Sequence, residues 1–135
     1  MIIAVLTTCI LSLLGGIHFL WGLGVWFPIR DEAQLTRTVV GAPGVYRMPG
    51  PIPCFLVTVG LGLMALTLWL PPSWLVKLVM WLGAIAFLAR GALTYTKFWR
   101  RVATEEPFAT LDKRYYGPLC LFLGAAVIFV CLKGL

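Results

Sequence analysis

Long apolar runs are the feature that most constrains what this chain can fold into. Four of them stand out, over about residues 2–27, 53–70, 74–96 and 117–134. Each is close to the roughly 20 residues that a helix needs to cross a hydrocarbon core of about 30 Å. Backbone polar groups in lipid must find their hydrogen-bond partners within their own segment, so the runs predict helices and not strands.

The composition agrees with a membrane environment. The chain is 61% hydrophobic and 12% charged, whereas a soluble domain is about half apolar and a quarter charged. A chain of 135 residues cannot bury so much apolar surface in a core of its own. The first run lacks a basic segment before it and a cleavage site after it, so we interpret it as a retained helix. We therefore expect an all-α membrane protein, with residues 1–135 forming one bundle of four transmembrane helices.

The connections between the runs are short or rich in turn signals. Pro71-Pro72-Ser73 is all that separates the second run from the third, which predicts a tight helical hairpin. The longer connections cover about residues 30–51 and 97–116, and within the first we expect Leu35–Val40 to form a short strand-like or interfacial piece. Gly22 and Gly24 lie inside an apolar run, and we interpret both as packing glycines.

Charge predicts the orientation in the membrane. Four crossings place both long connections on one side, and both termini with the Pro-Pro turn on the other. The long connections hold all five acids and eight of the eleven basic residues, which are Arg30, Arg37, Arg47, Lys97, Arg100, Arg101, Lys113 and Arg114. Cytoplasmic loops carry an excess of Lys and Arg, so we expect the long connections in the cytoplasm and both termini outside. The net charge of +6 then fits a surface of anionic lipid, and we expect no binding to nucleic acid.

Two ionisable side chains, His18 and Arg90, fall well inside the predicted spans. Such residues are expensive to bury and are candidates for function. His18 lies about 15 Å and Arg90 about 10 Å from the cytoplasmic ends of their helices, at 1.5 Å per residue. Both share stripes with small residues, which favours faces turned towards protein. A pocket lined by His18, Trp21 and Arg90 follows, although Arg90 can also reach lipid headgroups or pair with Asp31, Glu32 or Asp112.

Several kinds of site are disfavoured. The chain has one histidine and we expect no acid within a helix, so neither a metal site nor a haem held by two histidines is expected within one protomer. A proton-coupled multidrug exporter is also disfavoured, because such transporters need an intramembrane carboxylate and we expect none in this chain. The four cysteines form no C-x-x-C pair and are interpreted as free apolar thiols. Phosphate-binding loops, nucleophile elbows and zinc-protease motifs are missing from the sequence.

The stretch from Arg90 to Leu121 carries a family resemblance. It holds a basic-aromatic run at 97–102, then Pro107-Phe108-Ala109 with Asp112, then Tyr116-Gly117-Pro118-Leu119-Cys120-Leu121. Together with His18, Trp21 and Gly24 in the first run, this resembles domain-of-unknown-function family 3995, a group of small bacterial four-helix membrane proteins. Members often carry an acid shortly after the third-helix arginine, where this chain has Ala92-Leu93-Thr94. An acid that pairs with Arg90 must then come from another segment.

The resemblance implies no reaction, but it points to one constellation. It favours a ligand or lipid pocket of His18, Trp21, Arg90, Phe108, Asp112 and Tyr116 in the bacterial inner membrane. Our first hypothesis is a non-enzymatic binding or accessory protein that holds a lipid, an amphiphile or a partner membrane subunit, without a cofactor. The alternatives are an oligomeric transporter or channel, and an enzyme with His18 as general base oriented by Asp112.

Overall fold

The computed structural model describes residues 1–133, and its regular secondary structure is helical, with no strand in that range. The long helices are α1 (Ile2–Gly22), α3 (Pro51–Thr67), α4 (Trp74–Leu93) and α7 (Gly117–Lys133). Short helices lie in the two long connections: α2 (Glu32–Val39), α5 (Lys97–Val102) and α6 (Phe108–Leu111). A π-helical turn, η1 (Asp112–Tyr116), joins α6 to α7.

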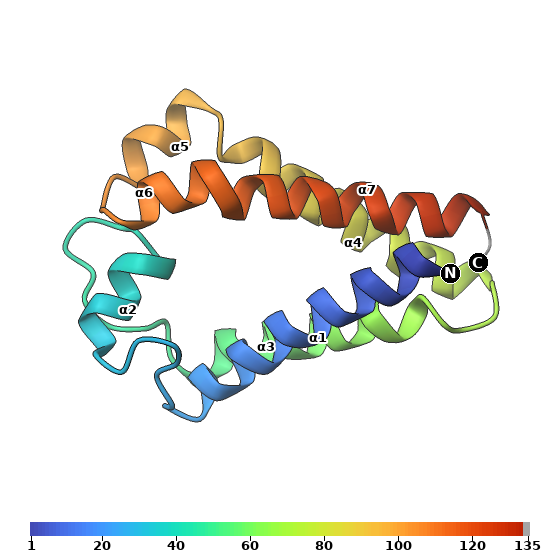
Figure 1. The fold of residues 1–135 in the computed structure, drawn as a ribbon, viewed down its shortest axis with the longest axis horizontal. Coiled ribbons are helices and arrows are strands. Elements are labelled where there is room, and N and C mark those ends of the chain that lie inside the picture. The colour runs from blue at the N-terminus through green and yellow to red at the C-terminus, as the bar shows by residue number, and fades with distance from the viewer. Residues whose placement is uncertain (134–135) are drawn as a thin grey trace.

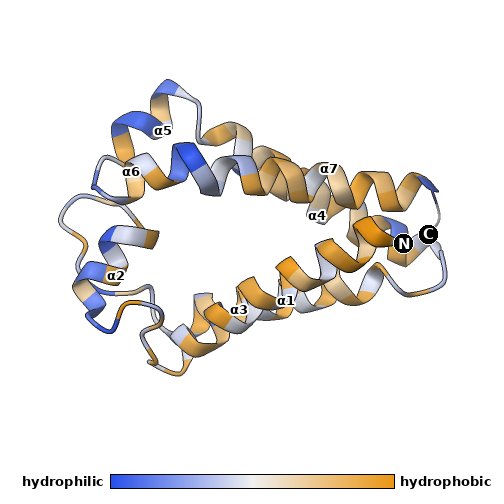
Figure 2. Cartoon of the chain, viewed as in Figure 1, coloured by the Kyte–Doolittle hydropathy of each residue, from blue (hydrophilic) through white to orange (hydrophobic). Residues whose placement is uncertain are grey.

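Three helical segments are long and apolar enough to cross a membrane, which indicates a membrane protein. They are Ile2–Gly22, Trp74–Leu93 and the 26-residue run Phe108–Lys133. The remaining long helix, α3, is apolar but has 17 residues. The long helices are mostly hydrophobic, whereas hydrophilic residues gather on the short helices at one end of the molecule (Figure 2). We call this end the polar end.

The long helices form two antiparallel pairs instead of one evenly packed bundle. Helix α1 packs along α3, and α4 packs along α7. The two pairs meet where the N-terminus and the α3–α4 turn lie, and they diverge towards the polar end (Figure 1). Buried side chains from all four helices fill the end where the pairs meet, among them Leu11, Met64, Leu68, Met80 and Leu123. The polar end has its own smaller core of Trp21, Leu35, Met48 and Cys54.

Glycines allow close contact within each pair. A Cβ on Gly22 of α1 would lie 2.6 Å from the ring of Phe55 on α3. A Cβ on Gly91 of α4 would lie 2.7 Å from Leu121 and 2.9 Å from the carbonyl oxygen of Gly117, both in α7. The interpretation of Gly22 as a packing glycine is therefore confirmed, and Gly91 plays the same part in the second pair.

Gly24, in contrast, was wrongly interpreted as a packing glycine, because it ends α1. Its φ is +77°, which favours glycine, and nothing lies within 4 Å of the position of its Cβ. The N–H of Gly24 donates to Trp21 and that of Val25 to Leu20, which is the hydrogen-bond pattern of a Schellman motif. Hydropathy could not reveal this stop, since the apolar run continues to residue 27.

Two further expectations about local structure need correction. For the segment Leu35–Val40, expected to be strand-like or interfacial, the strand-like alternative is wrong, because residues 35–39 lie in the helix α2, whose N-cap Asp31 accepts a hydrogen bond from the N–H of Gln34. The expectation of no acid within a helix was also wrong, because Asp112 is inside the helical run Phe108–Lys133. This run begins before the apolar segment, through the polar sequence of η1, and so its start has no hydropathy signal.

The close approach of α4 and α7 gives a test of this packing. We expect Gly91→Ala to lower the thermal midpoint of the detergent-solubilised protein, because its methyl group meets backbone in α7 and overpacking typically costs about 1–3 kcal/mol. Gly62→Ala in α3 is the matched control, since nothing lies within 4 Å of that Cβ position. The control should be neutral or stabilising, because alanine favours a helix over glycine by about 1 kcal/mol. Equal midpoints for the two variants would contradict the packing described for Gly91.

Candidate functional site

A cavity of about 730 Å³ lies between the two helix pairs. Such a volume is in the range of small-molecule sites, which is about 300–1,000 Å³. Its walls are mainly apolar and come from all four long helices, with further residues from α2, α6 and η1. The lining residues are Leu14, Ile17, His18, Trp21, Pro28, Val39, Val57, Gly60, Leu61, Met64, Gly83, Ala86, Phe87, Arg90, Phe108, Tyr116, Leu119 and Cys120. His18 and Arg90 therefore face one common cavity.

A fully buried carboxylate, that of Asp112, organises the polar end of this cavity. Arg90 donates from Nη2 to Oδ1 at 2.7 Å, and Arg100 donates from Nη2 to Oδ2 at 2.8 Å. The indole Nε1–H of Trp99 also donates to Oδ2 at 2.8 Å. Asp112 itself has no exposed surface. Its two oxygens thus receive three strong donors, which is what a buried charge requires.

Arg90 is held on several sides and still reaches the cavity. Its Nη1 donates to Oγ1 of Thr94 at 2.8 Å, and its Cζ lies 5.1 Å from the ring centroid of Trp99. The second distance is within the range of a cation–π contact. One third of the side chain remains exposed (33%). A guanidinium has five N–H donors. The hydrogen bonds to Asp112 and Thr94 use two of them, so Arg90 keeps donors for a further group.

His18 and Trp21 form the facing part of the cavity wall on α1. The Nδ1 of His18 lies 2.7 Å from the carbonyl oxygen of Leu14, and Nε1 of Trp21 donates to the carbonyl oxygen of Phe27 at 2.7 Å. The two rings pack with centroids 4.8 Å apart. The hydrogen bond from Trp21 fixes the irregular segment that follows α1 against the helix.

Phe108 and Tyr116 close the polar end against the first long connection. Tyr116 donates its hydroxyl hydrogen to the carbonyl oxygen of Thr38 at 3.1 Å, and its ring lies 5.8 Å from that of Phe108. Phe108 is almost fully buried and leaves no room for a Cβ on Gly41. The N–H of Glu105 donates to the carbonyl oxygen of Gly41 at 3.1 Å. We call residues 38–41 the strap, because they tie α2 to α6 across the open end of the two pairs.

The structure brings five of the six expected pocket residues to the cavity wall. These are His18, Trp21, Arg90, Phe108 and Tyr116. Asp112 lies behind Arg90 and holds it, so this aspartate is the acid that another segment had to supply. The catalytic pairing of His18 with Asp112 is not formed: Nδ1 of His18 meets the carbonyl of Leu14, and the bonds of Asp112 go to two arginines and a tryptophan.

Sequence reasoning missed Trp99 and Arg100 as parts of the site. They belong to the basic-aromatic run at 97–102, whose composition is typical of a membrane boundary. Their separation from Asp112 crosses the turn between α5 and α6, so no helical periodicity relates them. Glu105 and Glu106 are closer to Trp99 and Arg100 in the sequence than Asp112 is, so sequence distance does not identify the acid of the site.

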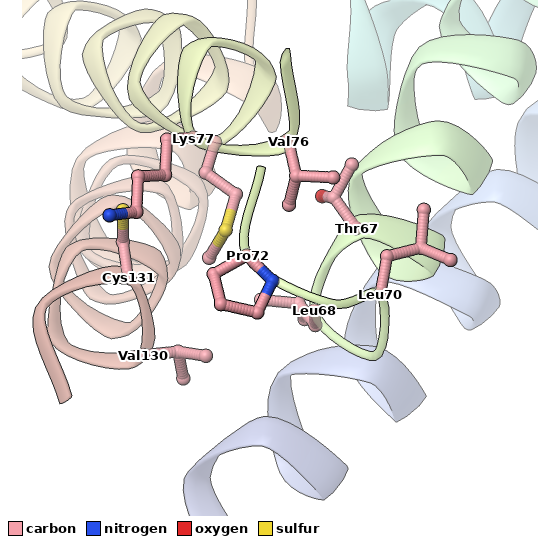
Figure 3. Close-up of a pocket in the computed structure, with 9 residues that line it drawn as sticks. Thr67, Leu68, Leu70, Pro72, Val76, Lys77, Val130 and Cys131 are labelled. Atoms are coloured by element: carbon pink, nitrogen blue, oxygen red, sulfur yellow. The ribbon is translucent and has the colours of Figure 1, made fainter. Parts of the chain in front are cut away.

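Among residues 1–133 no three His, Cys, Asp or Glu side chains come together in a way that could hold a metal ion. A second, small cavity of about 50 Å³ lies where the pairs meet, between the α3–α4 turn and α7 (Figure 3). It has room for a few water molecules, and Lys77 is the one charged residue that lines it.

The buried carboxylate gives a sharp test of the site. Asp112→Asn keeps the side-chain size but removes the charge that Arg90 and Arg100 share. Removing one partner of a buried pair costs about 3–5 kcal/mol, so we expect a large fall of the thermal midpoint in detergent. The control is Glu105→Gln, which breaks the exposed pair with Arg37 at 3.5 Å and should cost about 0–1 kcal/mol. Similar midpoints for the two variants would refute the central position of Asp112.

No curated protein and no solved structure matches the chain. The model of a family of proteins of unknown function, DUF3995, matches residues 11–127. This range includes the whole cavity wall together with Asp112, Trp99 and Arg100. The resemblance found in the sequence motifs is thereby confirmed, and the chain belongs to the DUF3995 family.

Proposed function

We propose that this protein is a binding protein of the bacterial inner membrane that holds an anionic amphiphile in the cavity between its two helix pairs. In this proposal all four long helices cross the bilayer, with the polar end in the cytoplasm. The 17 residues of α3 are at the lower limit of the roughly 17–25 that span a membrane. The excess of Lys and Arg in the connections at the polar end supports this orientation.

The observation that carries the proposal is a preorganised cation at one end of an apolar cavity. Leu14, Leu61, Met64 and Phe87 are among the apolar side chains that suit a hydrocarbon chain. Arg90 lies at the polar end of the same cavity, fixed by Asp112 and Thr94. A side chain that is already held in place loses little conformational freedom when a ligand binds. The cavity therefore matches a molecule with an apolar tail and an anionic head.

The local charge balance favours an anionic head group. Two guanidinium groups, from Arg90 and Arg100, share the single carboxylate of Asp112. The cluster therefore keeps one positive charge, and it does so next to apolar walls, where water screens it weakly. A ligand anion close to Arg90 would neutralise this charge.

An amphiphile can reach the cavity from the side. Val57 and Gly60 of α3 and Ala86 of α4 line the cavity and are also exposed. A Cβ at Gly60 would meet nothing within 4 Å. These small or exposed positions lie between diverging helices, so in a bilayer they would face the acyl chains of lipids.

Binding is a better match to this shape than conduction. The end where the pairs meet is filled by buried apolar side chains, including Leu11, Leu68 and Val127. A transport path would have to pass through this packed core. The cavity is consequently blocked at the end where the pairs meet.

The first test removes the cation from the cavity. We expect Arg90→Gln to lose most of the anionic amphiphile that copurifies with the wild-type protein, as measured by native mass spectrometry after mild detergent extraction. Arg101→Gln is the matched control, because Arg101 is an exposed arginine outside the cavity wall. The same bound molecules at the same occupancy in Arg90→Gln and wild type would end the proposal.

The second test fills the cavity. Ala86→Phe places a ring in the space that an acyl chain would occupy, so we expect a several-fold lower occupancy of bound amphiphile. Ile85→Phe makes the same kind of change one position away, at a residue that is 57% exposed and does not line the cavity. Wild-type occupancy is expected there. If Ala86→Phe retains full occupancy, or Ile85→Phe loses as much, the amphiphile does not lie in this cavity.

A further inference from the structure

We infer that the cavity selects an amphiphile whose head group carries a free hydroxyl beside its anionic group. This inference rests on the proposed function and names the chemistry of the head group. It follows from where the hydrogens of the polar side chains in the cavity wall are directed. Glycerol-type phosphodiester head groups belong to the class of ligand described.

His18 presents an acceptor to the cavity. A carbonyl oxygen has no hydrogen to give, so the 2.7 Å contact with Leu14 requires the hydrogen to be on Nδ1 of His18. In the neutral ring Nε2 is then unprotonated and accepts hydrogen bonds. Because Nδ1 is bonded to the backbone of the same helix, Nε2 on the far side of the ring is the nitrogen left for a ligand, and His18 is one of the residues that line the cavity.

Tyr116 and Trp21 have also committed their hydrogens to backbone carbonyls. Tyr116 donates to Thr38, so its oxygen keeps accepting capacity, and Trp21 donates its only polar hydrogen to Phe27. Among these polar side chains of the cavity wall, Arg90 alone keeps strong N–H donors for a ligand.

The cavity thus offers donors at one place and acceptors at others. Arg90 can bind an anionic oxygen, but Nε2 of His18 and the oxygen of Tyr116 can be satisfied only by hydrogens that a ligand or water brings. A head group with an anion and no hydroxyl would leave these acceptors to water alone, without the direct hydrogen bonds that a hydroxyl supplies. A head group with both would pair all of them.

Two lipids with the same acyl chains and the same single negative charge test this inference. Phosphatidylglycerol has two hydroxyls, whereas phosphatidylmethanol has none. Each is titrated into the delipidated wild-type protein in detergent, and occupancy is measured by native mass spectrometry. We expect phosphatidylglycerol to bind about three- to tenfold more tightly, the effect of about one net hydrogen bond.

The outcomes separate this inference from the proposed function. Equal affinity for the two lipids would overturn the inference and leave the proposed function intact. Binding of neither lipid would overturn both. Glycerol phosphate without acyl chains is added as a competitor, and we expect it not to displace the lipid. Displacement at concentrations similar to those of the lipid would overturn the amphiphile assignment itself.

Variants then assign the selectivity to named acceptors. We expect His18→Phe, which keeps an aromatic ring against Trp21, to reduce the preference for phosphatidylglycerol towards one. Tyr116→Phe should reduce it in part. Tyr115→Phe is the matched control, since Tyr115 is exposed and does not line the cavity. A full preference in His18→Phe and Tyr116→Phe alike would contradict the role of both acceptors.

Discussion

The carboxylate of Asp112 has lost all its contact with water, and the arrangement of the polar end follows from how that loss is compensated. An ionised carboxylate is stable in such a place only when cations and N–H donors replace the water. Asp112 lies in η1, Arg90 comes from α4, and Trp99 and Arg100 come from α5. The hydrogen bonds to this one carboxylate therefore hold three elements together. The same interaction neutralises part of the cost of placing Arg90 beside apolar side chains. The hydrogen bonds that hold the polar end together therefore also hold Arg90 in the candidate site.

The divergence of the two helix pairs explains why a cavity exists at all. Within each pair, glycines such as Gly22 and Gly91 remove the side-chain bulk that would keep the helices apart. Between the pairs such close contact occurs at one end, where Leu11, Met64 and Leu123 pack together. Towards the polar end, larger residues including Trp21, Phe87 and Tyr116 border the space instead. The cavity therefore follows from the divergence of the pairs, since its lining includes small residues such as Gly60 and Ala86 beside these large ones.

Hydropathy and motifs predicted the helical membrane fold, the family and five residues of the cavity wall. The membrane constraint is strong, so apolar run length alone places the long helices. It does not report where a helix ends, as Gly24 shows, because a Schellman stop depends on φ and not on polarity. It also does not report that Asp112 continues a helix, because the polar residues of η1 lie outside the apolar run. Contacts across turns, such as those of Trp99 and Arg100, need three-dimensional information.

The strap at residues 38–41 has a mechanical consequence. The two helix pairs are in contact at one end, so a small change in the angle between them there becomes a larger displacement at the polar end. The strap lies at the polar end, and two of its hydrogen bonds are accepted by backbone carbonyls, those of Thr38 and Gly41. At the polar end the contacts of this short segment join the first long connection to the second pair, whereas the packed core joins the pairs at the other end. A strap of different length would change the spacing of the pairs at the polar end and leave the packed core of the four helices as it is.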